Sequence, residues 1–519
     1  MVLSLLRYAE RHKTLVVRLL RLASCSDSPR VFSLLAPESR LTPCAASSVV
    51  LGRLPLRICY AYSAFSGCST VSSSPSTHIG PMSVGSAPTK RSLSASGPTV
   101  LATEREPIEV TVDIDGEEVL VGLLRVHQRR GQSVTFQYDE SYLTNARAYP
   151  LDPSLQLGGG VFSPASGQTL FGALADSSPD RWGQALMRRS ERSRAQAAGT
   201  QARTLGGPDF LLGVRDELRQ GAIRFRCINS DEHLGADDDG VPAVVNLPRL
   251  LAASDELDQS GPDGQDLKDL IAAGSSLGGA RPKAAVRLND GSLGIAKFPR
   301  KGYDNWDIPL WEMVEASLAA RSGITMSDCR LDDVAGRNVF IASRFDRAGD
   351  RRIGFVSAMT LLEATDGVHR SYLEIAEVIE IYSDTPSEDL EELFRRIVFS
   401  VLTGNTDDHL RNHGFLRRGS GWQLSPAYDL NPNPDSPVNR STDLDSDGLV
   451  ATVANLLSVS EYFRVATDRA KELVGEIEAA TSEWRSVAKA YGAKLADVSL
   501  MELAYDNEQR SEARRLAVE

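Results

Sequence analysis

The stretch LEELFRRIVFSVLTGNTDDHLRNHGFLRRGSGWQLSPAYD, residues 390–429, contains the clearest structural signals in this chain. Its first part repeats apolar residues at i, i+3 and i+4 spacing over three turns, which predicts a helix with one face in a core. Gly404 follows the last apolar position and predicts the end of that helix. A polar loop comes next, and two short apolar segments around Arg417–Gly421 predict a hairpin.

The loop after this helix is dense in side chains that bind metal ions or move protons. In protein kinases, the loop Asp and a metal-binding Asn lie five residues apart, and a second metal-binding Asp follows a hairpin later. Asp407 and Asn412 have this spacing, and Asp429 follows the predicted hairpin. Because Asp and Asn are also common in caps and turns, the spacing alone favours an ordinary loop. Support for a kinase-type site at Asp407, Asn412 and Asp429 has to come from the rest of the chain.

The length of 519 residues exceeds one typical core and predicts two or three domains. A hydrophobic fraction of 42% with 24% charged residues is typical of a globular protein. The net charge of −12 argues against a broad nucleic-acid-binding surface. The six Cys form no CxxC pattern and predict free thiols in a reducing, cytoplasmic compartment.

The first hundred residues differ from the rest. They carry eleven Lys or Arg against three acidic residues and end in a Ser/Gly/Pro tract. A targeting peptide, a disordered tail, and upstream sequence with translation beginning near Met82 are the three interpretations. We favour a disordered or spurious extension over residues 1–104. Its longest apolar run, Leu15–Leu22, is interrupted by Arg18 and Arg21, so we expect no transmembrane helix and no membrane partner.

From residue 105 to 230 the sequence predicts a small β-rich domain. Alternating or apolar runs predict strands at Ile108–Ile114, Val119–Leu124 and Val134–Tyr138. A helix is expected over Gln184–Arg192. Asp180 is expected to cap it, and Trp182 to be anchored in a core.

Residues 274–283, GSSLGGARPK, form the second informative region. Small residues let backbone amides approach a phosphate closely. A predicted hairpin follows, and Lys297 lies on its second strand, on the same face as Leu293 and Ile295. A Gly-rich loop, a strand pair and an inward Lys are what an ATP-binding lobe requires. The loop is not GxxxxGK[ST], so no Walker A loop is predicted.

The order of these signals is stronger evidence than any one of them. The helix after the Lys strand carries Glu312 and Glu315, either of which is placed to pair with Lys297 or to face solvent. A hinge at Ser343–Arg347 and a mostly helical region follow. The fold class predicted is α+β: a small N-terminal β-rich domain, then a two-lobed, protein-kinase-like domain with a large helical C-lobe. An acidic linker and the N-lobe would occupy residues 231–343, and the C-lobe residues 344–519.

These residues resemble the HipA-type serine/threonine kinases, the toxin halves of bacterial toxin–antitoxin pairs. The resemblance covers about residues 108–510. It is carried by SLGGARPK (276–283), IAKFP (295–299), SRFDR (343–347), NTDDHLRN (405–412), SPAYDL (425–430), FQYDESYL (136–143), AYPLDPSL (148–155) and the segment Asp176–Gly183.

The resemblance implies a role for each matching position. Asp407 would be the catalytic base, Lys297 would contact the α- and β-phosphates of ATP, and Asn412 with Asp429 would hold Mg²⁺. A Ser at the head of the Gly-rich loop is autophosphorylated in the family; here it is Ser276, with Ser275 as the rival. The implied nucleotide-binding residues are Gly278, Gly279, Ala280, Arg281, Pro282, Lys283, Lys297, Ser343, Arg344, Phe345, His409, Leu410, Arg411, Asn412, Tyr428 and Asp429.

The resemblance also implies partners. They are a helix-turn-helix antitoxin, DNA reached only through that antitoxin, and a protein substrate, with aminoacyl-tRNA synthetases among the candidates. Two alternatives stay open: a small-molecule or lipid kinase of the same fold, and a non-catalytic co-repressor that binds ATP and works through its antitoxin.

Overall fold

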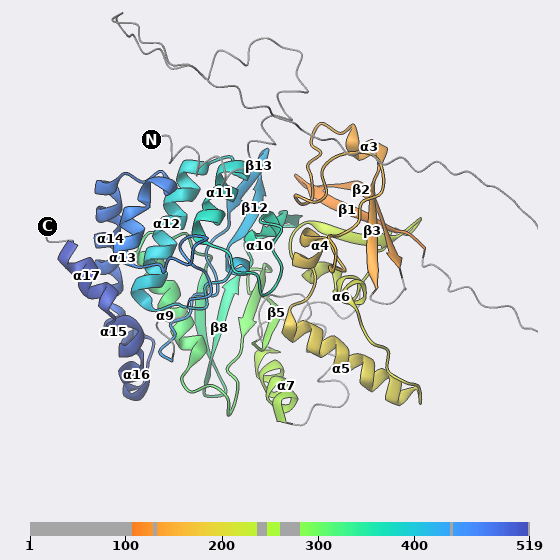
Figure 1. Ribbon diagram of the computed structural model, residues 1–519. Coiled ribbons are helices and arrows are strands. Elements are labelled where there is room, and N and C mark those ends of the chain that lie inside the picture. The colour runs from red at the N-terminus through yellow and green to blue at the C-terminus, as the bar shows by residue number, and fades with distance from the viewer. Residues whose placement is uncertain (1–105, 128–131, 236–245, 260–280, 436–439, 517–519) are drawn as a thin grey trace, which may run out of the picture. The chain divides into compact units, whose positions relative to one another are not determined.

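The computed structural model describes residues 106–127, 132–235, 246–259, 281–435 and 440–516 (Figure 1). The chain divides into two compact units, Met1–Ala95 and Ser96–Glu519, and the described residues all belong to the second. The extension expected over residues 1–104 therefore lies outside the described residues. Within the described part of the chain, no helix is both long and apolar enough to cross a membrane.

An antiparallel sheet in the order β3-β2-β1-β4 opens the described part. Its strands are β1 (Ile108–Ile114), β2 (Glu117–His127), β3 (Ser133–Tyr138) and β4 (Ile223–Cys227). Val110 and Val112 lie on one face of β1 and are fully buried in the core. Asp115 and Gly116 both have positive φ and close the two-residue turn between β1 and β2.

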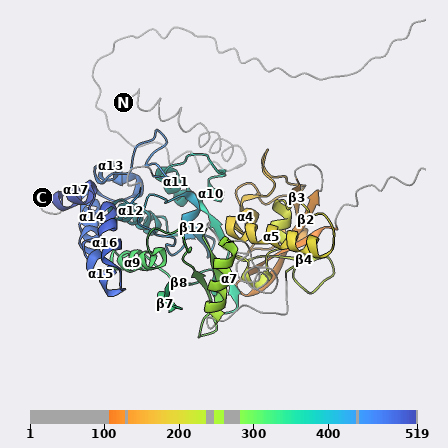
Figure 2. The ribbon, with the colours of Figure 1, turned by 90° about the horizontal axis from the view of Figure 1, so that it is seen from below.

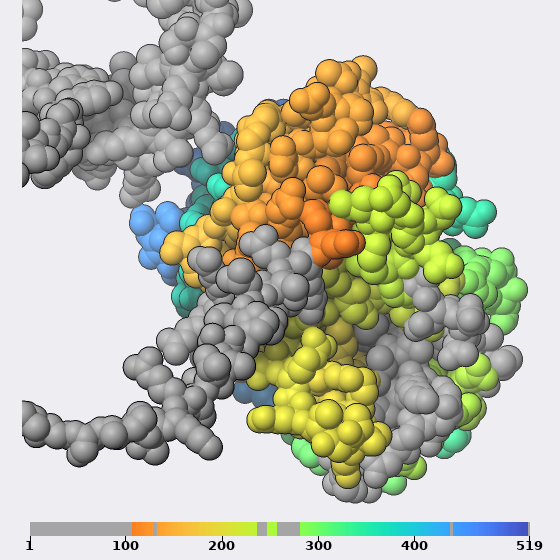
Figure 3. Space-filling model, turned by 90° about the vertical axis from the view of Figure 1, so that its right-hand side faces the viewer, coloured from red at the N-terminus to blue at the C-terminus, as the bar shows by residue number. Residues whose placement is uncertain are grey.

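Short helical elements connect β3 to β4. They are α3 (Glu140–Leu143), α4 (Gly172–Asp176), α5 (Arg181–Ala197), α6 (Gly207–Leu212) and the 3₁₀ helix η2 (Asp216–Leu218). Asp180 is the N-cap of α5 and accepts a hydrogen bond from Gly183 N at 2.7 Å, so its predicted capping role is confirmed. Helix α5 begins earlier and ends later than the helix predicted from Gln184. In Figure 3 its residues, in yellow, form part of the same face as the orange N-terminal sheet.

A second antiparallel sheet, in the order β5-β6-β8-β7, carries Lys297. This region consists of α7 (Leu247–Gln259), β5 (Lys283–Arg287), β6 (Leu293–Lys297), α9 (Ile308–Arg321), β7 (Cys329–Val334) and β8 (Arg337–Ser343). The hairpin β5–β6 pairs Lys283 directly with Lys297. Helix α9 is capped by Asp307 and is buried over nearly its whole length, which suits its almost continuous apolar sequence.

The rest of the described chain is mainly helical, with the small sheet β11-β12-β13 at its start. Its elements are β9 (Arg347–Ala348), β10 (Arg351–Arg352), β11 (Phe355–Ser357), α10 (Ala358–Leu361), α11 (Tyr372–Tyr382), α12 (Pro386–Thr403), η4 (Leu410–Asn412), β12 (Gly414–Arg418), β13 (Gly421–Leu424), α13 (Val453–Ser458), η5 (Ser460–Phe463), α14 (Thr467–Ser482), α15 (Trp484–Ala490), α16 (Leu495–Tyr505) and α17 (Glu508–Leu516). Helix α12 buries the apolar face that its sequence predicts. It ends at Gly404, whose φ of 68° is left-handed.

Two apolar clusters tie these regions together. The larger one runs from β1 and β3 of the N-terminal sheet to the C-terminal helices, including Val110, Phe136, Leu393 and Leu473. The smaller one joins Trp182 on α5 to the β5-β6-β8-β7 sheet, so Trp182 is anchored in a core as expected. Figure 2 shows α4 and α5 beside β2, β3 and β4 of the N-terminal sheet. The C-terminal helices α14, α15, α16 and α17 lie on the opposite side.

Candidate active site

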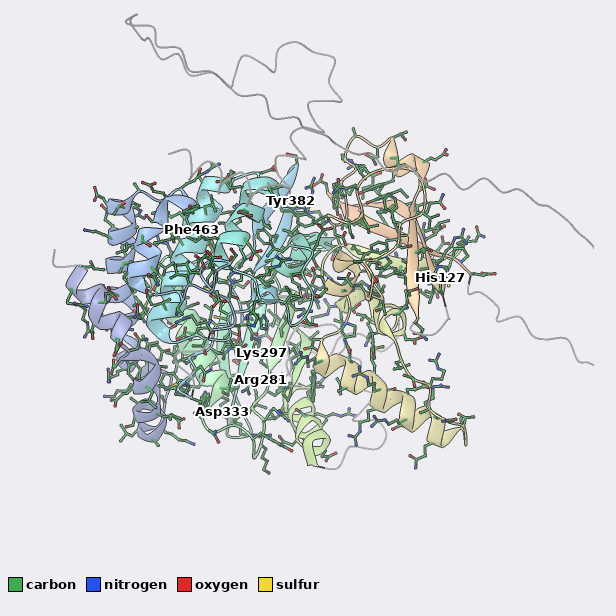
Figure 4. All side chains as sticks on the ribbon, viewed as in Figure 1. His127, Arg281, Lys297, Asp333, Tyr382 and Phe463 are labelled. Atoms are coloured by element: carbon green, nitrogen blue, oxygen red, sulfur yellow. The ribbon has the colours of Figure 1, made fainter. Side chains whose placement is uncertain are left out.

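Lys297, labelled in Figure 4, is the last residue of β6. Its ammonium group lies between two carboxylates. Its Nζ contacts Oε1 of Glu312 on α9 and lies 2.8 Å from Oδ1 of Asp429. Burial disfavours the ammonium ion, but the two carboxylates outweigh burial and hold the pKa of Lys297 above its usual range. Although burial opposes ionisation of Asp429, Lys297 holds the pKa of that carboxyl well below its usual range. The strand, the helix and the distant Asp429 segment therefore meet at one ion-pair cluster.

The two glutamates of α9 have different partners. Glu312 contacts Lys297, and its burial raises its pKa against the opposing effect of that ammonium. Glu315 instead accepts a hydrogen bond from Tyr505 Oη on α16. Burial raises the pKa of Glu315 to about 8. Of the two residues that the sequence offered as partners for Lys297, only Glu312 is in contact with it in the structure.

Asp429 lies on a segment that touches both the hinge and the loop after α12. Its φ of 59° is left-handed, a conformation that Asp tolerates better than most side chains. The ring of the neighbouring Tyr428 lies 5.5 Å from that of Phe345 in the hinge. Tyr428 Oη donates a hydrogen bond to the carbonyl oxygen of Arg411 at 2.5 Å. This bond joins the Asp429 segment to the Asp407–Asn412 loop.

The Asp407–Asn412 loop presents Asp407 to solvent. Asn412 donates its side-chain Nδ2 to the carbonyl oxygen of Asp407 at 3.1 Å, which closes the loop. Ser441 Oγ donates to Asp407 Oδ1 at 3.2 Å. His409 is among the charges that lower the pKa of Asp429, so the loop lies within electrostatic range of that carboxylate.

Asp408, next to the candidate base, points into the protein. Its carboxylate accepts a hydrogen bond from Tyr372 Oη at 2.7 Å and lies 3.1 Å from His413 Nε2. Its carbonyl oxygen accepts from Thr442 Oγ1 at 2.6 Å. Burial opposes ionisation of Asp408, but His413 and the hydrogen bond from Tyr372 hold the pKa of its carboxyl below the usual range. Asp408 anchors the loop, a role that sequence reasoning did not assign.

Several other implied nucleotide-binding residues have their side chains engaged elsewhere. The guanidinium of Arg344 is buried against Asp346 and the carbonyl oxygen of Leu218. Arg281 donates to Asp304 at 2.8 Å, Arg411 pairs with Asp366, and Leu410 is part of the core. At these positions a nucleotide would meet backbone groups or require these side chains to move. Ser343 ends β8, and its backbone N donates to the carbonyl oxygen of Asp328.

The head of the Gly-rich loop, including Ser275, Ser276, Gly278, Gly279 and Ala280, lies outside the described residues. The structure does describe its end, where the carbonyl oxygen of Pro282 accepts a hydrogen bond from Phe298 N. Lys283 Nζ lies 3.0 Å from Oδ2 of Asp180, which comes from the N-terminal domain. No local pattern pointed to this contact, because the two residues are 103 positions apart.

Asn412 and Asp429, which the resemblance implies as Mg²⁺ ligands, carry oxygen donors of the kind that Mg²⁺ prefers. Asn412 uses its amide nitrogen in the bond to Asp407, so its side-chain oxygen is not committed to that bond. Asp429 offers a carboxylate, and Mg²⁺ is typically bound by one or two protein oxygen ligands plus phosphates and water. Among the described residues, no group of three or more His, Cys, Asp or Glu side chains is placed to hold a metal ion.

The architecture is therefore α+β, with an N-terminal β-rich domain and two lobes whose junction carries the Lys297 cluster, as the sequence predicted. Two family models match the chain: the HipA N-terminal domain over residues 112–205, and the HipA-like C-terminal domain over residues 275–484. Together they cover more than half of the chain. The chain belongs to the HipA family.

Two relatives and one solved structure are also similar to this chain. "Putative kinase Y4mE" of Sinorhizobium fredii is 24% identical over 337 residues, which span 58% of this chain and 73% of the relative. "Putative kinase Y4dM" of the same organism is 29% identical over 158 residues, or 27% of this chain and 37% of the relative. The Shewanella oneidensis HipA, solved with HipB and its operator DNA, matches with a TM-score of 0.55 at 14% identity. That match covers 79% of this chain and 97% of the solved one.

Proposed function

We propose that the chain is an ATP-dependent serine/threonine protein kinase and the toxin of a toxin–antitoxin pair. The observation that carries the proposal is the convergence of Lys297, Glu312 and Asp429 at the junction of the lobes. A lysine held by a helix glutamate, beside a metal-binding aspartate, is the arrangement that protein kinases require for activity. Family membership and two relatives named as kinases support the same conclusion.

Each residue has a defined task in this proposal. Lys297, held in place by Glu312, binds the α- and β-phosphates of ATP. Asp407 accepts the proton of the substrate hydroxyl, since its carboxylate faces solvent where a substrate can reach it. Asn412 and Asp429 hold Mg²⁺, which neutralises phosphate charge. Phe345 and Tyr428, whose rings lie against each other, flank the adenine side.

Regulation and partners follow the family. Phosphate on Ser276 adds a charge of about −1.5 to −2 at the head of the Gly-rich loop and excludes the phosphates of ATP, so the kinase silences itself. A helix-turn-helix antitoxin binds the chain and links it to DNA. The solved HipA is itself in complex with HipB and operator DNA, which motivates this part of the proposal. The protein substrate is a cellular protein such as an aminoacyl-tRNA synthetase.

Phosphate transfer from labelled ATP tests the proposal. The full chain with Mg²⁺ and ATP should label itself, and mass spectrometry should find the phosphate on Ser276. Asp407→Ala and chelation of Mg²⁺ should each abolish labelling. Equal labelling by the wild type and Asp407→Ala would refute the assigned chemistry. Phosphate found only on added metabolites would favour a small-molecule kinase. ATP binding without any transfer would favour a non-catalytic co-repressor.

A further inference from the structure

Two lysines lie side by side on the hairpin that carries the candidate nucleotide site. Lys283 and Lys297 are directly paired across β5 and β6, so their side chains leave the sheet on the same face. Like charges placed directly opposite each other repel, and each ammonium group needs a carboxylate nearby. Lys297 has Glu312 and Asp429. The carboxylate at Lys283 comes from Asp180, outside the two lobes.

The Asp180–Lys283 pair is deeply buried. The two side chains are 6% and 3% exposed, and Nζ lies 3.0 Å from Oδ2. An ammonium group in such surroundings keeps its charge only while a carboxylate compensates for its lost hydration. Because Lys283 stands directly opposite Lys297 in the β5–β6 pair, its charge acts on the Lys297 cluster. Lys283 is thus an electrostatic member of the site, and Asp180 is its counter-ion.

The segment that carries Asp180 is fixed to both lobes. Asp180 accepts from Gly183 N at 2.7 Å, and Trp182 Nε1 donates to the carbonyl oxygen of Lys283 at 3.3 Å. Four residues earlier, Asp176 accepts hydrogen bonds at 2.7–2.8 Å from the backbone N and Oγ of Ser357 and from Thr360 Oγ1. Residues 176–182 therefore contact the β5–β6 hairpin of one lobe and the start of α10 in the other.

We propose that Asp180 is a positioning residue of the nucleotide site, holding Lys283 toward the phosphates as Glu312 holds Lys297. The N-terminal domain then contributes one of the ion pairs that shape ATP binding, and is more than an appendage to the kinase lobes. The inference rests on the proposed kinase function. It also implies that a partner which shifts residues 176–182 changes the affinity for ATP without touching the nucleotide.

Substitution of Asp180 by Asn distinguishes the two roles of this residue, as partner of Lys283 and as helix cap. Asn caps a helix as well as Asp does, so Asp180→Asn keeps the bond from Gly183 N and removes only the charge. The matched control is Asp139→Asn, the same change at the cap of α3, where Asp139 accepts from Ser141 N at 2.9 Å. Lys283→Met and the double variant complete a thermodynamic cycle.

Affinity for Mg²⁺-ATP is measured by calorimetry on the full chain, so that the result does not depend on catalysis. We expect Asp180→Asn to raise the Kd for ATP about tenfold, the typical effect of losing a charge-assisted hydrogen bond. Asp139→Asn should leave the Kd unchanged. Asp180→Asn should melt a few degrees lower than Asp139→Asn, because it leaves Lys283 buried without its carboxylate, so the Kd is measured well below both transitions. In the Lys283→Met background, Asp180→Asn should have no further effect.

The outcomes separate this inference from the proposed function. If the wild type binds ATP and Asp180→Asn binds it equally well or more tightly, the role of Asp180 is refuted while the kinase proposal stands. The same holds if Asp180→Asn still weakens binding tenfold in the Lys283→Met background, because Asp180 would then act through another group. If the wild type binds no ATP, both proposals fail.

Discussion

Replacing Lys297 by Met tests the ion-pair cluster most directly. At 2.8 Å the attraction between Lys297 and Asp429 is about 6 kcal/mol at an effective dielectric constant of about 20, before desolvation is subtracted. Breaking a fully buried pair costs about 3–5 kcal/mol. Asp429 is 37% exposed, and water therefore screens part of its charge. Since Met fills much of the volume of Lys, we expect the free energy of unfolding to fall by about 2 kcal/mol at pH 7.

The assay is urea denaturation followed by far-UV circular dichroism, together with phosphate transfer on the same samples. Lys301→Met is the matched control, because Lys301 is exposed in the turn after β6. It should change the free energy of unfolding by less than about 0.5 kcal/mol. Lys297→Met should also lower phosphate transfer at least about 100-fold through loss of phosphate binding. If Lys297→Met is as stable as Lys301→Met, the Lys297 cluster does not form as described. If transfer is unaffected, Lys297 has no part in catalysis.

Three further variants probe other parts of the fold. Asp407→Asn should abolish transfer and change the free energy of unfolding by less than about 0.5 kcal/mol, because Asp407 is exposed; a variant that unfolds instead would contradict this placement. Burial raises the pKa of Glu315 to about 8 in the folded state. Between about pH 4.3 and 8 the folded state therefore holds a proton that the unfolded state has released. The free energy of unfolding should fall as pH rises through this range. Glu315→Gln should remove that fall in denaturation measured from pH 5 to 8, and an unchanged slope would refute it. Gly404→Ala should lower the free energy of unfolding by about 1–3 kcal/mol, because φ at this position is 68° and the added Cβ would lie 2.8 Å from the carbonyl oxygen of Ala504. A melting temperature equal to that of the wild type would contradict this expectation.

Local sequence signals were sufficient for the parts of the site that lie on one element. The apolar face of α12, its end at Gly404 and the loop that follows were predictable because periodicity and a left-handed glycine act within a few residues. The β5–β6 hairpin and the place of Lys297 on it were predictable from alternation around a turn. The choice between Glu312 and Glu315 was not. The two are one helical turn apart, and only the packing of α16 against α9 directs Glu315 to Tyr505.

Long-range pairing explains what the sequence could not reveal. Asp180 was correctly predicted as a cap, and that local role was sufficient to account for it, so nothing pointed to Lys283 more than a hundred residues later. Asp408 was equally ambiguous beside Asp407, because adjacent acids in a loop carry no sign of which one turns inward. The inward one is identified by its partners, Tyr372 from α11 and the nearby His413. In both cases the fold buries a charged group, and the cost of burying that charge requires a partner that only the tertiary structure can supply. Among charged residues near a predicted site, those that the fold buries with a partner are therefore the first to test, and Asp180 is one of them.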